Sequence, residues 1–197
     1  MSKLRLAILA PIAALSLAGC GLNSVPTAEE EVNAAFGNLQ AEYQRRNDLI
    51  GNLVETVQAA ADSEEQILTQ ITEARASATS AQLSPDQLDN PEAVQAYANA
   101  QGQLANARSL LGTVIMERYP QLASQERFAD LMVQLEGTEN SILVARRDYN
   151  DSVRAYNTEI RTFPSAIGAK VFYDAEPKVP FEAAEGAEEA PTVDFDQ

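Results

Sequence analysis

The apolar residues of this chain recur at alternating spacings of three and four over two long stretches. The first stretch runs from Val32 to Ala60, and the second runs from Phe128 to Phe163. This spacing places the apolar side chains on one face of an α-helix, whereas a strand would need them at every second position. Strand patterns are scarce in the rest of the chain. The spacing therefore predicts long amphipathic helices that bury their apolar faces against one another.

Capping and turn residues divide the chain into four predicted helices. Thr27 is a candidate N-cap, and Asp62-Ser63 is the favoured break between the first two helices, with one continuous helix as the alternative. The turn-rich sequence LSPDQLDNP, residues 83–91, separates the second helix from the third. The helices are predicted to begin near residues 28, 63, 92 and 124. We therefore predict an all-α fold, an up-down bundle of about four long antiparallel helices with an extended acidic C-terminal tail.

The first 19 residues have the features of an export signal. A short basic start precedes the apolar run LAILAPIAALSLA, which is too short and too interrupted by proline to span a membrane comfortably. Leu17-Ala18-Gly19-Cys20 resembles the cleavage site of bacterial lipoproteins, in which the cysteine becomes the lipidated N-terminus. Cys20 is the only cysteine in the chain, so it has no disulfide partner.

From these features we expect residues 1–19 to be a lipoprotein signal peptide and residues 20–27 to be a tether. Lipid attached to Cys20 would then anchor an extracytoplasmic domain to a bacterial membrane, either inner or outer. The alternative is an ordinary signal peptide whose cleavage site is followed by a cysteine.

Charge and composition exclude several kinds of partner and chemistry. Without residues 1–19 the chain loses two of its 14 basic side chains and keeps all 29 acidic ones, for a net charge near −17. Such a charge repels nucleic acid and anionic lipid. The absence of histidine and of a second cysteine disfavours common zinc sites and nucleophile–base pairs. We therefore predict no nucleic-acid partner, no cofactor, no metal and no enzymatic activity. The rival hypothesis is an enzyme that uses a carboxylate pair, such as Glu55 and Glu139, as acid and base.

The last predicted helix carries more polar side chains than packing requires. Counting inward from Ala28 and Pro164 places Arg46 level with Arg146, and Asn52 level with Asn140. We predict a polar seam between the first and last helices, which either fixes the register of the bundle or forms a groove for a partner protein. The predicted seam comprises Arg45, Arg46, Asp48, Asn52, Glu55, Glu136, Glu139, Asn140, Arg146, Arg147, Asn150 and Asn157.

The composition changes after Pro164, where prolines, carboxylates and small residues accumulate. This composition favours an extended or disordered chain. We therefore predict a helical bundle over residues 28–164 and an extended or disordered acidic tail over residues 165–197. Truncation after Phe181 is expected to leave the melting temperature nearly unchanged.

Two sequence blocks resemble the bacterial LemA family. They are QRRNDLIGNLVETV, residues 44–57, and EGTENSILVARRDYNDSVRAYNTEIRTFPS, residues 136–165; TEARA and the ending KVPFEAAEGAEEAPTVDF fit as well. The resemblance implies a long-helix bundle in a membrane-associated envelope protein without an assigned reaction. Members commonly begin with a membrane-spanning helix, which a lipoprotein-like signal replaces here. Members also often have proline where this chain has Gly51, so we predict a bend in the first helix there.

Together these features predict a lipid-anchored envelope protein that acts as a non-enzymatic scaffold or adaptor. Its partners would be the membrane, through the N-terminal lipid, and an unknown envelope protein, and self-association is left open. The alternative is a binding module that holds a small apolar or lipid ligand between its helices. A large internal cavity lined by Tyr43, Tyr149 and Tyr156 would favour the binding module, whereas a filled core would favour the scaffold.

Overall fold

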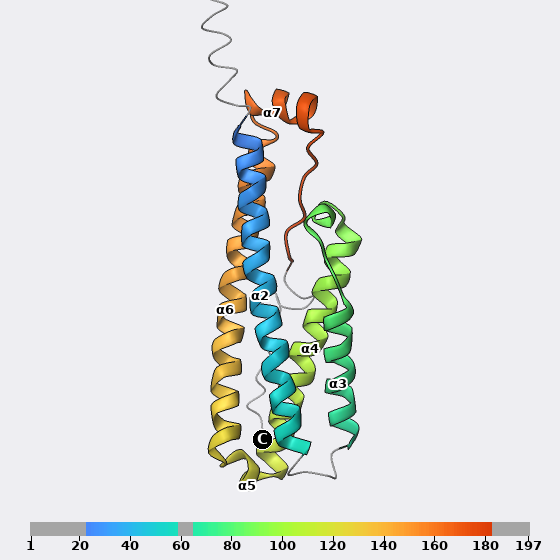
Figure 1. The fold of residues 1–197 in the computed structure, drawn as a ribbon, viewed down its shortest axis with the longest axis vertical. Coiled ribbons are helices and arrows are strands. Elements are labelled where there is room, and N and C mark those ends of the chain that lie inside the picture. Colours follow the sequence, from blue (N-terminus) through green and yellow to red (C-terminus); the bar gives the residue numbers. More distant parts are fainter. Residues whose placement is uncertain (1–22, 59–64, 183–197) are drawn as a thin grey trace, which may run out of the picture.

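The computed structural model describes residues 23–58 and 65–182, and every regular element within these ranges is helical. The four long helices are α2 (Ser24–Gln58), α3 (Glu65–Ser80), α4 (Pro91–Arg118) and α6 (Glu126–Glu159). Helices α2 and α4 run in one direction and α3 and α6 run in the other (Figure 1). The predicted all-α bundle of four long antiparallel helices is confirmed.

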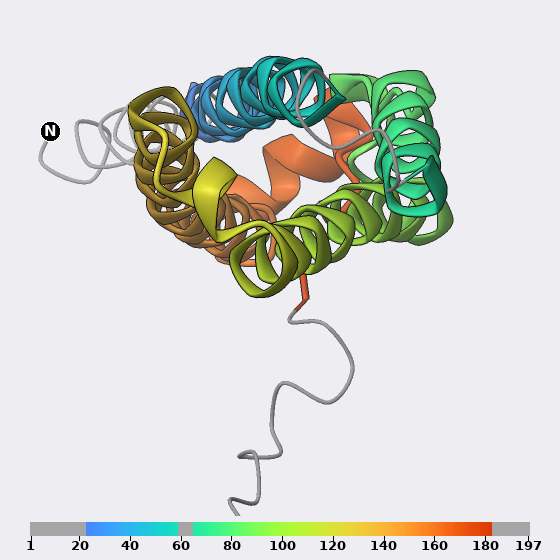
Figure 2. The same ribbon diagram turned by 90° about the horizontal axis from the view of Figure 1, so that it is seen from below.

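The bundle contains two closely packed helix pairs, α2 with α6 and α3 with α4. Phe36 on α2 meets Tyr149 on α6, with 5.8 Å between the ring centroids. Seen along its axis, the bundle forms a ring in the order α6, α2, α3, α4 (Figure 2). No helix within the described ranges is both long and apolar enough to cross a membrane.

The alternative of one continuous helix through the first two predicted helices is wrong. Helix α3 runs back along α2, where the Asn47 side-chain amide donates to the Thr79 hydroxyl at 2.6 Å. The favoured break at Asp62-Ser63 lies outside the described residues. Helix α2 continues through Gly51, where a Cβ would come within 2.8 Å of the Arg75 guanidinium. Glycine at this position therefore makes room for the Arg75 side chain.

The start of α2 and the end of α6 differ from their predicted positions by several residues, whereas α4 begins within one residue of its predicted start. Helix α2 begins at Ser24, so residues 24–27, predicted as tether, form its first turn. Helix α6 ends at Glu159, five residues before Pro164. Asn90 caps α4, because its Oδ1 accepts hydrogen bonds from the backbone amides of the first turn at 2.9 and 3.2 Å. The predicted pairing of residues on α2 and α6 was counted from the expected ends, so these differences change it.

The core consists of two apolar clusters. One cluster surrounds Phe36 and Tyr149, and the other surrounds Ile50 and Leu135. Every predicted apolar-face position of α2 from residue 32 to residue 57 is buried, including the charged Arg46. A polar layer separates the two clusters. It consists of Arg46 with its neighbours Gln101, Arg108 and Glu139.

The chain after α6 stays on the bundle. Residues 165–173 were predicted to be extended or disordered, but they form α7 (Ser165–Gly168) and the π-helical turn η2 (Ala169–Tyr173) across one end of the bundle (Figure 1). Phe163 does not extend the apolar face of α6, because α6 has already ended. Residues 174–182 have no regular secondary structure, and the part from Lys178 to Phe181 binds α6 and packs against α4. We call residues 178–182 the strap; residues 183–197 lie outside the described ranges.

Candidate functional site

A buried guanidinium joins three helices in the polar layer. Arg46 on α2 is only 2% exposed. Its Nη2 donates to the backbone and side-chain oxygens of Gln101 on α4 at 2.9 and 2.8 Å, and its Nη1 lies 3.5 Å from Glu139 on α6. The guanidinium also lies 5.0 Å from the ring centroid of Tyr43. Burial lowers the pKa of Arg46 and Glu139 opposes this shift, so the side chain stays charged.

The Glu139 carboxylate forms ion pairs with two arginines but no close hydrogen bond with either. It lies 3.5 Å from Arg46 Nη1 and 3.7 Å from Arg108 Nε. Arg46 Nε, Arg108 Nε and Glu139 Oε1 are buried without a hydrogen-bond partner. Because buried polar groups are normally hydrogen-bonded, the polar layer retains hydrogen-bonding capacity.

The polar layer borders a groove between α4 and α6. The groove has a volume of about 410 Å³, and its lining includes Arg46, Glu139 and Arg146. The 62% exposed Leu143 lies on its α6 side, and the end of the strap closes part of it. A groove was predicted between the first and last helices, α2 and α6. These helices pack closely, yet a hollow of about 540 Å³ does lie between them. Asn140 lines that hollow, whereas the other members of the predicted seam do not.

The predicted register between the first and last helices is also wrong. Arg46 lies level with Glu139, seven positions before Arg146, which is about 10 Å along a helix. The count began at Ala28 and Pro164, whereas the helices begin and end at Ser24 and Glu159. Asn52 and Glu55 are exposed and therefore do not meet their expected partners on α6.

Several of the predicted seam residues lie on the surface of the bundle. Asp48 accepts a hydrogen bond from Gln44 at 2.9 Å, and Arg147 lies 3.9 Å from Asp151 on the same helix. Such exposed contacts within one helix contribute little to stability. The exposed members of the predicted seam are Arg45, Asp48, Asn52, Glu55, Glu136, Asn140 and Arg147.

The remaining asparagines of the predicted seam hold the strap to α6. The Asn150 side chain donates to the Phe181 carbonyl and accepts from the Phe181 amide, both at 2.9 Å. Asn157 makes the same two bonds with the backbone of Lys178, both at 2.8 Å. Each asparagine therefore completes the hydrogen bonds of one strap residue, as a neighbouring strand would do.

The spacing of the two asparagines matches the rise of an extended peptide. Seven residues of helix from Asn150 to Asn157 advance about 10.5 Å. Three residues of extended chain from Lys178 to Phe181 advance about 10 Å. A repeated Tyr-Asn pair, at residues 149–150 and 156–157, was the available sequence signal for this site. Sequence reasoning missed its meaning because the partner of the pair is backbone, which has no residue type to recognise.

Further contacts anchor the strap in an aromatic cluster. The Tyr149 hydroxyl donates to the carbonyl of Val179 at 2.9 Å, and Arg146 donates to the carbonyl of Glu182. The Phe181 ring is buried, with 5.1 Å between its centroid and that of Tyr149. Burial raises the pKa of Tyr149, so its hydroxyl stays protonated and remains a donor at neutral pH. The strap is therefore held by both its backbone and an aromatic side chain.

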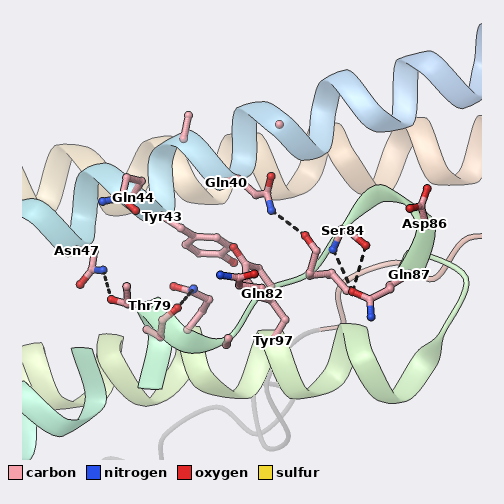
Figure 3. A pocket seen from close by; sticks show the side chains of 16 residues that line it. Gln40, Tyr43, Gln44, Asn47, Thr79, Gln82, Ser84, Asp86, Gln87 and Tyr97 are labelled. Carbon is pink, nitrogen blue, oxygen red and sulfur yellow. Dashed lines mark hydrogen bonds between the residues drawn. The ribbon is translucent and has the colours of Figure 1, made fainter. Parts of the chain in front are cut away.

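A second hollow, of about 860 Å³, opens between α2, the end of α3 and α4 (Figure 3). Tyr43 and Tyr97 approach each other there, with 5.8 Å between their ring centroids. Tyr149 and Tyr156 lie in the filled core and do not line it. Six carboxamide side chains do: Gln40, Gln44, Asn47, Gln82, Gln87 and Gln101. In the described part of the chain, no three carboxylates gather closely enough to hold a metal ion.

The sequence model of the LemA family matches residues 35–195 of this chain. This span contains both the polar layer and the strap. The chain belongs to the LemA family. This membership confirms the resemblance of the two sequence blocks. It also shows that the family pattern includes the strap residues as well as the helices.

Curated relatives of this LemA-family chain include magnetosome proteins. Magnetosome protein MamQ 2 of Paramagnetospirillum magneticum is 28% identical over 158 residues, which cover 72% of this chain and 58% of the relative. Magnetosome protein MamQ of Magnetospirillum gryphiswaldense is 27% identical over 177 residues, covering 82% of this chain and 65% of the relative. The matched part of the chain thus spans less than two thirds of the length of these relatives.

Changing Asn157 to alanine is expected to speed hydrogen exchange of the backbone amide of Lys178 with solvent. This amide donates to Asn157, and loss of such a bond costs about 1–3 kcal/mol when the group is left unsatisfied. Hydrogen exchange followed by NMR would show faster exchange at Lys178 and Phe181, because the strap loosens as a unit. Asn140→Ala, an exposed amide on the same helix, is the control and should leave both rates unchanged. Unchanged protection of Lys178 in Asn157→Ala would contradict the role of this clamp.

Proposed function

We propose that this LemA-family protein is a lipid-anchored, extracytoplasmic envelope protein that acts as a non-enzymatic scaffold or adaptor. Lipid on Cys20, which lies outside the described residues, would tether the bundle to the membrane. The family membership and the likeness to magnetosome proteins support association with a membrane. The scaffold role rests on the groove between α4 and α6.

The observation that carries the proposal is that α6 binds an extended segment through its backbone. Asn150 and Asn157 hold the strap through hydrogen bonds to its backbone, and backbone hydrogen bonds are also the basis of peptide recognition by strand addition. Glu182, the last described residue of the strap, lines the groove. A partner segment laid in line with the strap would meet Arg146 and the Glu139 carboxylate, whose side chain is 25% exposed.

Two other functions have less support from the geometry. The acid–base pair of the rival enzyme hypothesis is not assembled, because Glu55 is exposed on α2 while Glu139 lies in the polar layer. A module for apolar ligands was expected to have a cavity lined by three tyrosines. Of these tyrosines only Tyr43 lines the large hollow, whose lining includes six carboxamide side chains, whereas Tyr149 and Tyr156 fill the core.

Site-specific photo-crosslinking in intact cells tests the adaptor function. A photoreactive residue at Leu143, inside the groove, is expected to capture a discrete envelope protein at native abundance. The same residue at Val133, equally exposed on α6 but outside the groove, is the matched control and should not capture it. Arg146→Ala in the Leu143 background should abolish the crosslink, because Arg146 lines the groove.

The outcomes separate docking from architecture. Capture of the same proteins at both positions, or capture that survives Arg146→Ala in a folded protein, would contradict docking in the groove. A crosslink from Leu143 to residues 183–197 of the same chain would show that the groove is filled from within, which would also contradict the adaptor.

A further inference from the structure

One end of the bundle exposes a concentration of large apolar side chains. It is formed by the turn after α6, by α7 and by η2. Other exposed apolar side chains are scattered along α4 and α6, whereas this group falls within eleven consecutive residues. We call the group the apolar cap: Phe163, Ile167, Val171, Phe172 and Tyr173, which are 79, 58, 68, 67 and 44% exposed. Concentrations of this kind mark surfaces that bind a protein or a membrane.

The apolar cap lies beside the start of α2 (Figure 1). The Ser24 hydroxyl donates to the Ser165 hydroxyl at 3.3 Å, so the first residue of α2 contacts α7. Cys20, the proposed lipid attachment site, precedes Ser24 by four residues. Four residues of chain span at most about 14 Å. A lipid on Cys20 would therefore hold Ser24 within that distance of the bilayer, at the end of the bundle that carries the cap.

The cap also differs in charge from the rest of the molecule. The chain has a net charge of −15, yet between residues 159 and 176 the cations Arg161 and Lys170 oppose Glu159, Asp174 and Glu176, for a local net charge of −1. So small a local charge lets this end approach a bilayer without strong repulsion. Arg161 and Lys170 are exposed, and their long stems can lie along apolar surface while their charges reach lipid headgroups. The acidic run at residues 29–31 begins five residues into α2, about 7.5 Å further along its axis.

We propose that the apolar cap is a membrane-docking surface, which inserts into the interface of the bilayer that holds the lipid anchor. The bundle then stands on the membrane with its long axis pointing away. This inference rests on the proposed lipid anchor, because the anchor brings the cap to the bilayer. The lipid alone leaves the orientation of the bundle free, whereas an inserted cap fixes it and sets the height of the α4–α6 groove above the membrane. Acyl chains and an inserted apolar surface together anchor more stably than either signal alone.

Tryptophan fluorescence tests the docking, because the chain has no tryptophan of its own. Phe172→Trp places one reporter in the cap, and Val133→Trp places one at an exposed site of α6. Each protein, purified from host membranes, would be reconstituted into phosphatidylcholine vesicles with brominated acyl chains. Insertion of the cap to the boundary of the acyl chains is expected to quench Phe172→Trp emission at least about twofold and to leave Val133→Trp unchanged. Adding Ile167→Ser and Val171→Ser should remove the quenching, and circular dichroism would verify that the helices remain.

Flotation of the same samples separates failure of the cap from failure of the anchor. If the protein floats with vesicles through Cys20, as a Cys20→Ser control would show, but Phe172→Trp is not quenched, the docking surface is wrong and the anchor stands. If flotation does not depend on Cys20, the proposed anchor is wrong. Quenching that survives the two serine substitutions would contradict insertion of the cap. A blue shift of Phe172→Trp that depends on protein concentration in detergent, without quenching in vesicles, would assign the cap to contact with a second copy and overturn membrane docking.

Discussion

Replacing Arg46 with leucine is expected to lower the free energy of unfolding by about 3–5 kcal/mol, the cost of breaking a buried ion pair from one side. The substitution removes two hydrogen bonds to Gln101 and the ion pair with Glu139. It leaves the Glu139 carboxylate with Arg108 alone, at 3.7 Å. Denaturation by urea, followed by far-ultraviolet circular dichroism, measures the change.

Arg45→Leu is the matched control for this prediction, because it removes the same charge from the neighbouring, exposed position. We expect it to change the stability by about 0.5 kcal/mol or less. The double variant Arg46→Leu, Glu139→Leu should lose less than the sum of the two single variants, because neither charge is then left without the other. Equal midpoints for Arg45→Leu and Arg46→Leu would show that the polar layer does not hold α2, α4 and α6 together.

Replacing Phe181 with alanine is expected to lower the free energy of unfolding by about 3 kcal/mol, the lower end of the range for a buried phenylalanine. The ring is 4% exposed and packs against Tyr97 and Tyr149. The cost stays at the lower end because the strap can detach while the four helices remain packed. Denaturation by urea measures the loss, and hydrogen exchange at Lys178 would show that the strap has been released.

Phe172→Ala removes the same side chain from a site that is 67% exposed, and it is the control for Phe181→Ala. In detergent solution it should alter the stability by no more than about 0.5 kcal/mol. If both variants unfold at the same midpoint, the strap contributes no stability to the bundle. That result would also weaken the proposal that this face of α6 binds extended segments.

The two parts of the predicted polar seam have separate structural roles. Arg46 and Glu139 belong to a layer between two apolar clusters, where a buried charge tolerates few alternative partners. Asn150 and Asn157 face the gap between α4 and α6 and satisfy the backbone of the strap. The joining of α2, α4 and α6 therefore depends on Arg46, whereas the binding of an extended segment to α6 depends on Asn150 and Asn157.

The sequence by itself determined the helices, their buried faces and the family, because these depend on residues close together in the chain. The three-and-four spacing identified the buried face of α2 correctly, including the charged Arg46. Only the tertiary structure decided the register. The helix ends used for the count were four and five residues away from the observed ends, and Arg46 lies seven residues, about two turns, from its predicted level. It also decided the partners of Asn150 and Asn157, since these side chains bind the backbone of a segment that follows a different rise per residue. The groove and the apolar cap follow from that packing: the strap fills the upper part of the gap between α4 and α6, and the chain that leads to it crosses the end of the bundle.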